Sequence, residues 1–323
     1  MNWIDERHYR EMMEREVEPK LATLREDIHM PLPCGGTLHA EIYEPKDARR
    51  AVVISHGYTE SAEKFREMTC YFLDAGFSVY AVDHRGHGQS FRQVEDTSIT
   101  HIEHFHDYVD DLSLFIKTVV LPRTSGLPLC LYAHSMGGAI GALTLMEHPD
   151  WFARAVLTAP MIAASGGDYP RFVGAILSGF MCMIGKGKER AFIGKPFAEN
   201  DESFEAGCDT SRARFDYYAQ KRQNNVLLQN CSPSYSWIKE GLRVTRTLLN
   251  PENCKKIKTP LLLCQAGKDT LVLLPHQRRF VERVPGAKLR MFENAKHEIY
   301  GSDDATLKEY VPAVIGFLQG KDE

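Results

Sequence analysis

Short apolar runs alternate with helical patterns along most of this chain, and this alternation limits the fold more than any other feature of the sequence. The apolar runs span residues 51–54, 77–82, 129–132, 155–157, 260–264 and 288–292. The helical patterns span residues 62–75, 104–120 and 139–147. Runs that are apolar throughout are typical of parallel strands buried on both faces. We therefore expect an α/β fold with a mostly parallel central sheet and helices on both faces.

The alternation stops between Pro160 and about Asn253, where the sequence is rich in Gly, Arg, Met and aromatic residues. Open α/β sheets bind ligands outside the carboxyl ends of their strands, so an insertion here is expected to cover that edge. We predict a core formed by residues 1–160 and 254–323, with residues 161–253 as a helical cap. The length of 323 residues is compatible with one such core and its insertion.

Charge and composition limit the partners and the location of the protein. The formal net charge is −4, so we expect no nucleic-acid partner. The longest nearly uncharged apolar stretch, residues 172–184, is too short to span a bilayer. The amino terminus lacks the pattern of a signal peptide, and the eight cysteines form no CxxC pair, which favours reduced thiols. We expect a cytoplasmic protein, with peripheral contact at the inner face of the membrane left open.

Ser135 lies in the most informative stretch of the sequence. The apolar run at residues 129–132 leads into the turn Ala-His-Ser-Met-Gly at residues 133–137, and a helical pattern of small residues follows. Small residues on both sides of a serine are typical of a strained strand–turn–helix unit that exposes a nucleophilic hydroxyl. Residues 163–167 repeat the pattern around Ser165, but no helical pattern follows them. Ser135 is therefore the candidate nucleophile.

Four further residues would complete a site for acyl transfer. The amides of Met136, directly after the nucleophile, and of Tyr58, after the apolar run at residues 51–54, are expected to form the oxyanion hole. His297 follows the last apolar run and is the candidate base. Asp269 follows the run at residues 260–264 and is the candidate acid that orients the imidazole.

We predict neither a metal ion nor an organic cofactor. His101, His104 and His106 lie close together in the sequence, but their spacing is not that of a zinc site.

Longer motifs resemble a known family. These motifs are His56-Gly57 with Glu60, residues 83–90, residues 108–112 and residues 133–138. They resemble the monoacylglycerol lipase and lysophospholipase branch of the α/β-hydrolase superfamily, and residues 210–214 and 232–237 of the predicted cap are similar to bacterial lysophospholipases. Ala133 and Ser232 depart from the branch, which tends to have glycine at both positions. The resemblance implies the α/β-hydrolase fold and a triad of Ser135, His297 and Asp269.

The resemblance also implies hydrolysis of one acyl chain from a glycerol-based lipid. We expect a small lipid or ester substrate, cleaved through an acyl-enzyme, and a lysophospholipase as the first hypothesis. A monoacylglycerol lipase or a short-chain carboxylesterase is the alternative. A prolyl aminopeptidase-like hydrolase and a non-catalytic ligand-binding protein of hydrolase fold are further alternatives. The oligomeric state is not predicted.

Two groups of residues in the predicted cap bear on the substrate. Residues 172–184 are apolar on all sides if they are helical. One interpretation is a helix buried beneath the cap; the other is that Phe172, Ile176 and Phe180 line an acyl tunnel and touch a membrane, beside the basic residues Lys186, Lys188 and Arg190. Arg214, with its neighbours Arg212, Lys221 and Arg222, either meets a lipid phosphate or belongs to a solvated helix face.

Overall fold

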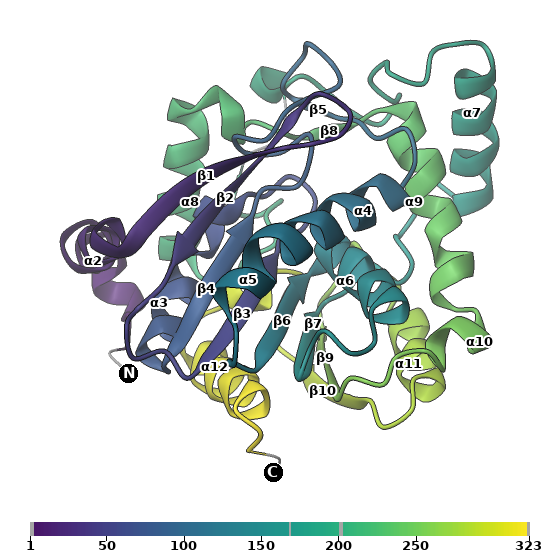
Figure 1. Cartoon of the computed structure of the whole chain (residues 1–323). Coiled ribbons are helices and arrows are strands. Elements are labelled where there is room, and N and C mark those ends of the chain that lie inside the picture. The colour runs from purple at the N-terminus through teal and green to yellow at the C-terminus, as the bar shows by residue number, and fades with distance from the viewer. Residues whose placement is uncertain (1–2, 168, 200–202, 322–323) are drawn as a thin grey trace.

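An eight-stranded sheet forms the centre of the computed structural model, which describes residues 3–167, 169–199 and 203–321 (Figure 1). In spatial order its strands are β1 (Arg25–Pro31), β2 (Thr37–Tyr43), β4 (Phe77–Val82), β3 (Arg50–Ser55), β6 (Leu129–His134), β7 (Arg154–Thr158), β9 (Leu261–Ala266) and β10 (Lys288–Phe292). β2 pairs antiparallel with β1 and with β4, and the strands from β4 to β10 are parallel. The carboxyl ends of these parallel strands therefore meet at one edge.

Helices cover both faces of the sheet. On one face lie α4 (His106–Phe115), α6 (Ser135–Glu147) and α11 (Leu274–Arg283), and on the other lie α3 (Arg66–Asp74) and α12 (Asp304–Leu318). Successive strand residues such as Val52 and Val53 are both fully buried but belong to opposite core layers, because side chains alternate across a strand. The predicted α/β fold with helices on both faces is confirmed.

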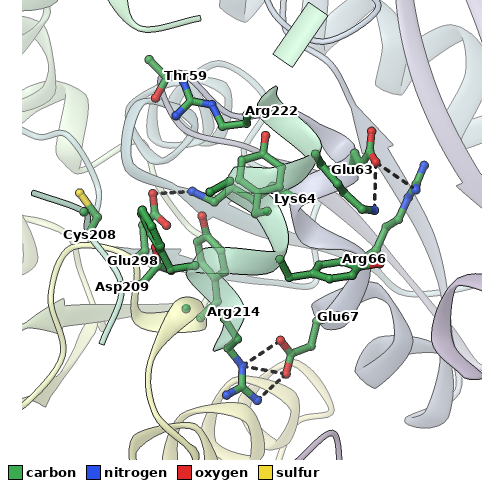
Figure 2. A pocket seen from close by; sticks show the side chains of 18 of the residues that line it. Thr59, Glu63, Lys64, Arg66, Glu67, Cys208, Asp209, Arg214, Arg222 and Glu298 are labelled. Atoms are coloured by element: carbon green, nitrogen blue, oxygen red, sulfur yellow. Dashed lines mark hydrogen bonds and ion pairs between the residues drawn. The ribbon is translucent and has the colours of Figure 1, made fainter. Parts of the chain in front are cut away.

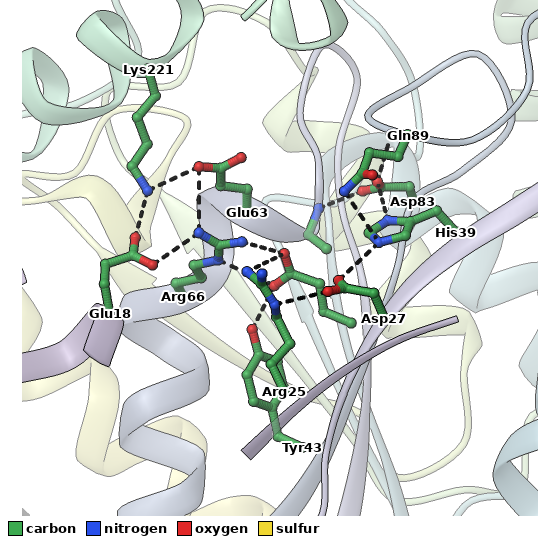
Figure 3. Close-up of polar contacts among 12 residues, drawn as sticks. Glu18, Arg25, Asp27, His39, Tyr43, Glu63, Arg66, Asp83, Gln89 and Lys221 are labelled. Atoms are coloured by element: carbon green, nitrogen blue, oxygen red, sulfur yellow. Dashed lines mark hydrogen bonds and ion pairs between the residues drawn. The ribbon is translucent and has the colours of Figure 1, made fainter. Parts of the chain in front are cut away.

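The amino-terminal segment packs against α3 and reaches one side of the inserted helices. It contains α1 (Tyr9–Met12), a π-helical turn (Met13–Val17) and α2 (Glu18–Leu24). Its buried side chains are Ile4, Tyr9, Met13, Val17 and Leu21. Glu18 forms ion pairs with Arg66 of α3 (2.9 Å) and with Lys221 of α8 (Arg212–Asn224) (2.5 Å), and Figure 3 shows how these side chains converge. The segment thereby ties an inserted helix to the core.

The residues between β7 and β9 form the helices α7 (Arg171–Met183), α8, α9 (Tyr235–Leu248) and α10 (Pro251–Cys254). α7 lies alongside α9, at the side of the molecule away from the sheet (Figure 1). A short parallel pairing of β5 (Ile99–Thr100) with β8 (Ser232–Pro233) joins this inserted segment to the loop after β4. No helix within the described ranges is long and apolar enough to cross a membrane.

The apolar helix α7 is exposed, so the interpretation of a buried helix is wrong. Phe172, Ile176 and Phe180 are 66%, 69% and 52% exposed. Their spacing of four residues places them on one face of the helix, while Gly174 faces Leu242 of α9. A helix that is apolar on every side has no periodic pattern that marks its buried face. The sequence therefore does not predict which face of α7 packs on the protein.

Candidate active site

Ser135 lies at a sharp turn between β6 and α6. Its backbone has a φ of 51°, a value that residues other than Gly, Asn and Asp seldom adopt. Glycine at 137 lets α6 approach the end of β3, because a β-carbon there would overlap the carbonyl oxygens of Ser55 and His56. The strain and the small residues together hold the Ser135 hydroxyl above the carboxyl edge of the sheet.

The side chains of Ser135, His297 and Asp269 form one hydrogen-bonded chain. Nε2 of His297 lies 2.8 Å from Oγ of Ser135, and its Nδ1 lies 2.7 Å from Oδ2 of Asp269. The Asp269 side chain is fully buried, and its Oδ1 accepts hydrogen bonds from the backbone N–H groups of Leu271 (2.8 Å) and Val272 (3.1 Å). The carboxylate is therefore held in place and can orient the imidazole.

The loop after β3 passes close to Ser135. A β-carbon on Gly57 would lie 2.7 Å from Oε2 of Glu60 and 3.0 Å from the Ser135 β-carbon, so glycine is required for this approach. The amide of Gly57 donates to Oε2 of Glu60 (2.5 Å), and Thr59 takes a positive φ of 63°. Tyr58 is therefore in a loop of fixed shape, and Met136 is in the first turn of α6, where helix amides have no partner within the helix.

Glu60 connects this loop to the loop that carries His297. Its Oε1 accepts a hydrogen bond from the hydroxyl of Tyr300, and Lys64 lies 3.6 Å away and pairs with Glu298 at 2.6 Å. Burial raises the pKa of Glu60 to about 7. Burial alone would also raise the pKa of Glu298, but the ammonium of Lys64 lowers it.

Two cavities lie in the part of the molecule around the triad, although no triad residue lines either of them. One cavity of about 450 Å³ has charged side chains such as Lys64, Arg66 and Glu298 in its wall (Figure 2), and we call it the polar cavity. Tyr58, Leu271 and Tyr300 also line it. An apolar cavity of about 430 Å³ is lined by residues that include Ala164, Phe192, Ile193, Trp237 and Leu242.

Tyr58 and Trp237 lie between the two cavities. Their rings pack with centroids 4.4 Å apart, and Tyr58 borders the polar cavity while Trp237 borders the apolar one. Ser135 is itself 7% exposed. The Tyr58–Trp237 ring pair therefore joins the walls of the two cavities.

Comparison with known proteins identifies the family. The family model described as Hydrolase_4, serine aminopeptidase S33, matches residues 46–304, which is most of the chain. The chain belongs to this family of α/β hydrolases. It is 32% identical to lysophospholipase L2 of Escherichia coli K12 over 290 residues, covering 83% of this chain and 80% of that protein. Monoacylglycerol lipase of Mycolicibacterium smegmatis is 26% identical over 269 residues, covering 81% and 85%.

Solved structures agree with the fold. A soluble variant of monoglyceride lipase from Saccharomyces cerevisiae, in complex with a substrate analog, has a TM-score of 0.75 at 16% identity, covering 93% of this chain and 96% of that one. A thermostable carboxyl esterase from Bacillus coagulans has a TM-score of 0.73 at 18% identity, covering 92% and 98%. The resemblance to the monoacylglycerol lipase and lysophospholipase branch is confirmed, and the protein is a serine hydrolase of the esterase and lipase type.

Two sets of predicted substrate contacts in this hydrolase need correction. Phe172, Ile176 and Phe180 lie on the outer face of α7, whereas the α7 residues that line the apolar cavity are Arg171 and Gly174. They are therefore not walls of an acyl tunnel.

Arg214 borders the polar cavity, but its guanidinium is engaged in the protein. It is 4% exposed and bonds both carboxylate oxygens of Glu67, at 3.0 Å and 2.9 Å, and the carbonyl of Ile4. The side chain is therefore not on a solvated helix face, and its ion pair argues against a phosphate ligand, which stays a prediction.

Sequence reasoning missed the polar cluster beside the triad. Glu60 was named only as part of a motif that carries the family resemblance, and Lys64, Glu298 and Tyr300 were not predicted as site residues. The spacing of four residues between Glu60 and Lys64, at the start of a helical pattern, was the available signal. Among the described residues no group of three or more His, Cys, Asp or Glu side chains is arranged to hold a metal ion; His101 contacts Oγ of Ser234 at 2.9 Å.

Proposed function

We propose that this hydrolase is a lysophospholipase that releases the fatty acid from a single-chain glycerolipid through a Ser-His-Asp triad. The observation that carries the proposal is the hydrogen-bonded chain from Asp269 through His297 to Ser135. Leu271 and Glu298, next to this chain in sequence, line the polar cavity, and the apolar cavity lies on the other side of the Tyr58–Trp237 ring pair. An ester of one acyl chain fits such a pair of cavities, because its carbonyl lies between an apolar and a polar part. The similarity to lysophospholipase L2 supports this substrate class.

The proposed reaction has two acyl-transfer steps. Oγ of Ser135 attacks the ester carbonyl while Nε2 of His297 accepts its proton, and Asp269 stabilises the imidazolium through Nδ1. The amides of Tyr58 and Met136 donate to the oxyanion, and each such donor contributes about 3 kcal/mol. The alcohol leaves with the proton from His297, and water then hydrolyses the acyl-enzyme with His297 as base.

The two cavities suggest how the substrate lies. The acyl chain would occupy the apolar cavity beside Trp237, and we propose residues 161–253 as the cap that covers it. The glycerol and head group would occupy the polar cavity beside Lys64 and Glu298. The ester carbonyl would then lie against the loop that carries Tyr58.

A monoacylglycerol lipase is the second candidate, and the charges of the polar cavity favour it. Within the part of the chain that the structure describes, four of the five cations that line the cavity are already paired with carboxylates: Lys64 with Glu298, Arg66 with Glu41, Arg214 with Glu67, and Lys221 with Glu18. The fifth, Arg222, donates to the backbone carbonyls of Leu228 and Asn230. Paired cations attract a phosphate less than free ones do, whereas a neutral glycerol needs only hydrogen bonds.

A substrate panel decides between these functions. We expect the highest kcat/KM on lysophosphatidylethanolamine or lysophosphatidylglycerol, lower values on monoacylglycerol and p-nitrophenyl butyrate, and no turnover of a prolyl amide. Ser135→Ala should abolish all hydrolysis without lowering the unfolding temperature. A preference for monoacylglycerol or for the short-chain ester would replace the lysophospholipase assignment by that alternative, and full activity of Ser135→Ala would contradict the triad.

We further propose that the outer face of α7 binds a membrane surface containing anionic lipid. Phe172, Ile176 and Phe180 form an exposed apolar stripe, and a contiguous apolar surface next to basic residues is typical of interfacial binding. Lys186 and Lys188 follow the helix, and their side chains are 49% and 61% exposed. They pair with Glu189 at 3.4 Å and with Glu103 at 3.6 Å, and such exposed pairs are weak enough to exchange for anionic lipid. Arg190 pairs with Asp96 at 2.5 Å, and the proposed membrane contact does not depend on it.

Co-sedimentation with vesicles of phosphatidylcholine and phosphatidylglycerol tests this contact. Replacing Phe172, Ile176 and Phe180 together with serine should weaken binding at least about tenfold while kcat/KM on dissolved p-nitrophenyl butyrate stays unchanged. Leu289→Ser is the matched control, since Leu289 is an exposed apolar residue of β10. Equal binding of the triple variant and the control would contradict the membrane contact.

A further inference from the structure

We propose that His56 is a positioning residue that aims the amide of Tyr58 at the oxyanion, acting through the carbonyl group of Gly57. The proposal rests on the proposed function, in which this amide stabilises the tetrahedral intermediate. His56 does not contact the reacting atoms, and the argument starts from its hydrogen bonds.

The proton of the His56 ring has one possible position. Nε2 lies 3.0 Å from the backbone nitrogen of His84 and accepts its N–H, and a backbone N–H can only donate. Nε2 is therefore unprotonated, so the single proton of the neutral ring is on Nδ1. Nδ1 lies 2.7 Å from the carbonyl oxygen of Gly57 and donates to it. The chemistry of the two partners thus fixes the tautomer.

The environment keeps the ring neutral. His56 is fully buried, and burial lowers its pKa against the opposing effect of Asp83. The rings of His84 and His87 lie 4.7 Å and 5.1 Å from it, measured between centroids. A second proton would displace the His84 amide from Nε2, so the ring makes both of its hydrogen bonds only in the neutral form.

The bond to the Gly57 carbonyl also fixes the Tyr58 amide. The two groups belong to one planar peptide unit, which is trans, so the C=O and N–H point in opposite directions. Holding the carbonyl towards His56 therefore directs the N–H away from it. If this peptide unit turned over, the N–H of Tyr58 would face Nδ1–H of His56, and both donors would lack an acceptor in a buried site.

This loop needs such a constraint because it contains glycine. Close contact with Ser135 and Glu60 requires glycine at position 57, and glycine has the freest backbone of all residues. Glu60 holds the peptide unit before Gly57 through its N–H, and His56 holds the unit after it through its C=O. The two bonds together remove the freedom that glycine introduces.

Two substitutions separate the positioning role from simple packing. In His56→Asn the carboxamide nitrogen can lie near the place of Nδ1 and donate to Gly57. In His56→Gln the carboxamide reaches the place of Nε2, can accept from the His84 amide, and leaves the Gly57 carbonyl without its donor. Both variants lose the ring, so packing alone predicts similar effects on activity.

We expect His56→Gln to lose about 100-fold in kcat on p-nitrophenyl butyrate, the size of one oxyanion donor, with KM changed by less than about threefold. Binding of a trifluoromethyl ketone, which forms a tetrahedral adduct, should weaken in parallel. His56→Asn should stay within about tenfold of the wild-type kcat. His39→Asn is the control for loss of a buried histidine, because His39 bonds Asp27 and Asp83 and not the oxyanion loop.

A folded His56→Gln variant with kcat within about threefold of the wild type, or equal losses in both His56 variants, would overturn the proposal. If His56→Gln does not fold, as measured by its unfolding temperature, His56→Asn decides alone: retained activity supports the positioning role and a loss of about 100-fold overturns it. Wild-type and Ser135→Ala enzymes in the same assay report on the proposed function separately. If they hydrolyse equally, both proposals fall.

Discussion

Replacing Arg214 with alanine should destabilise the protein without changing its choice of substrate. The Arg214 side chain is 3% exposed and joins four parts of the structure: Glu67 of α3, Asp304 of α12, Ile4 in the amino-terminal segment and its own helix α8. Alanine would remove the guanidinium and leave the carboxylate of Glu67, itself 6% exposed, without a positive partner. Breaking one side of a buried ion pair costs roughly 3–5 kcal/mol.

For a chain of this size a loss of this magnitude lowers the unfolding temperature by about 10 °C. Differential scanning calorimetry measures it directly. Arg212→Ala is the matched control on the same helix, because its ion pair with Asp216 is exposed on both sides and such a pair contributes less than about 1 kcal/mol. Replacing both Arg214 and Glu67 with methionine should restore much of the stability, since the buried Glu67 carboxylate is then no longer left unpaired and the other carboxylate that Arg214 bonds, Asp304, is partly exposed.

The kinetic part of the prediction uses two substrates. Rates on lysophospholipid and on monoacylglycerol should change by the same factor in Arg214→Ala, measured below its unfolding temperature. A shift in unfolding temperature below about 3 °C, or a selective loss of lysophospholipid hydrolysis, would refute the structural role of Arg214 and restore the phosphate interpretation.

Two further predictions concern the oxyanion loop. Gly57→Ala should lower kcat/KM about 100-fold and cost about 1–3 kcal/mol of stability, because the added carbon would lie 2.7 Å from Glu60 and 2.9 Å from His134. Steady-state kinetics and thermal unfolding measure the two effects, and Gly179→Ala is the control because the space around Gly179 is open. An unchanged kcat/KM in Gly57→Ala would be inconsistent with the close approach. Glu60→Gln should become more stable relative to the wild type as the pH rises from about 5 to about 8. The pKa of Glu60 is about 7 in the folded protein against an ordinary 4.5, so the folded wild type binds more protons than the unfolded chain between these pH values. The stability of the wild type therefore falls as the pH rises, whereas glutamine at position 60 does not titrate. A difference in unfolding temperature that stays constant with pH would contradict the buried, titrating carboxyl.

The fold could be predicted from the sequence because its signals are local and repeated. Apolar runs such as residues 51–54 and 129–132 become β3 and β6, and the helical patterns between strands become the covering helices. The positions of Ser135, Asp269 and His297 followed from the same pattern. Ser135 directly follows β6, and Asp269 and His297 lie in the loops after β9 and β10. The carboxyl ends of these parallel strands lie at one edge of the sheet, so the three residues come together there.

Other features depend on contacts between distant parts of the chain, which no local pattern reports. Arg214 looked available for a ligand because its partner, Glu67, is 147 positions away. α7 is apolar on all sides, so only the packing of α9 determines which face is exposed. The bond from His56 to Gly57 joins neighbouring residues, but its direction depends on the amide of His84, which the tertiary structure supplies.

The identity of the nucleophile is the central claim, and covalent labelling tests it most directly. The protein would be treated with a fluorophosphonate, digested, and the modified peptide sequenced by mass spectrometry. The account predicts a single modification on Ser135, with hydrolysis lost in proportion to labelling and no labelling of Ser135→Ala. Modification of another serine, such as Ser165, together with loss of activity, would contradict it.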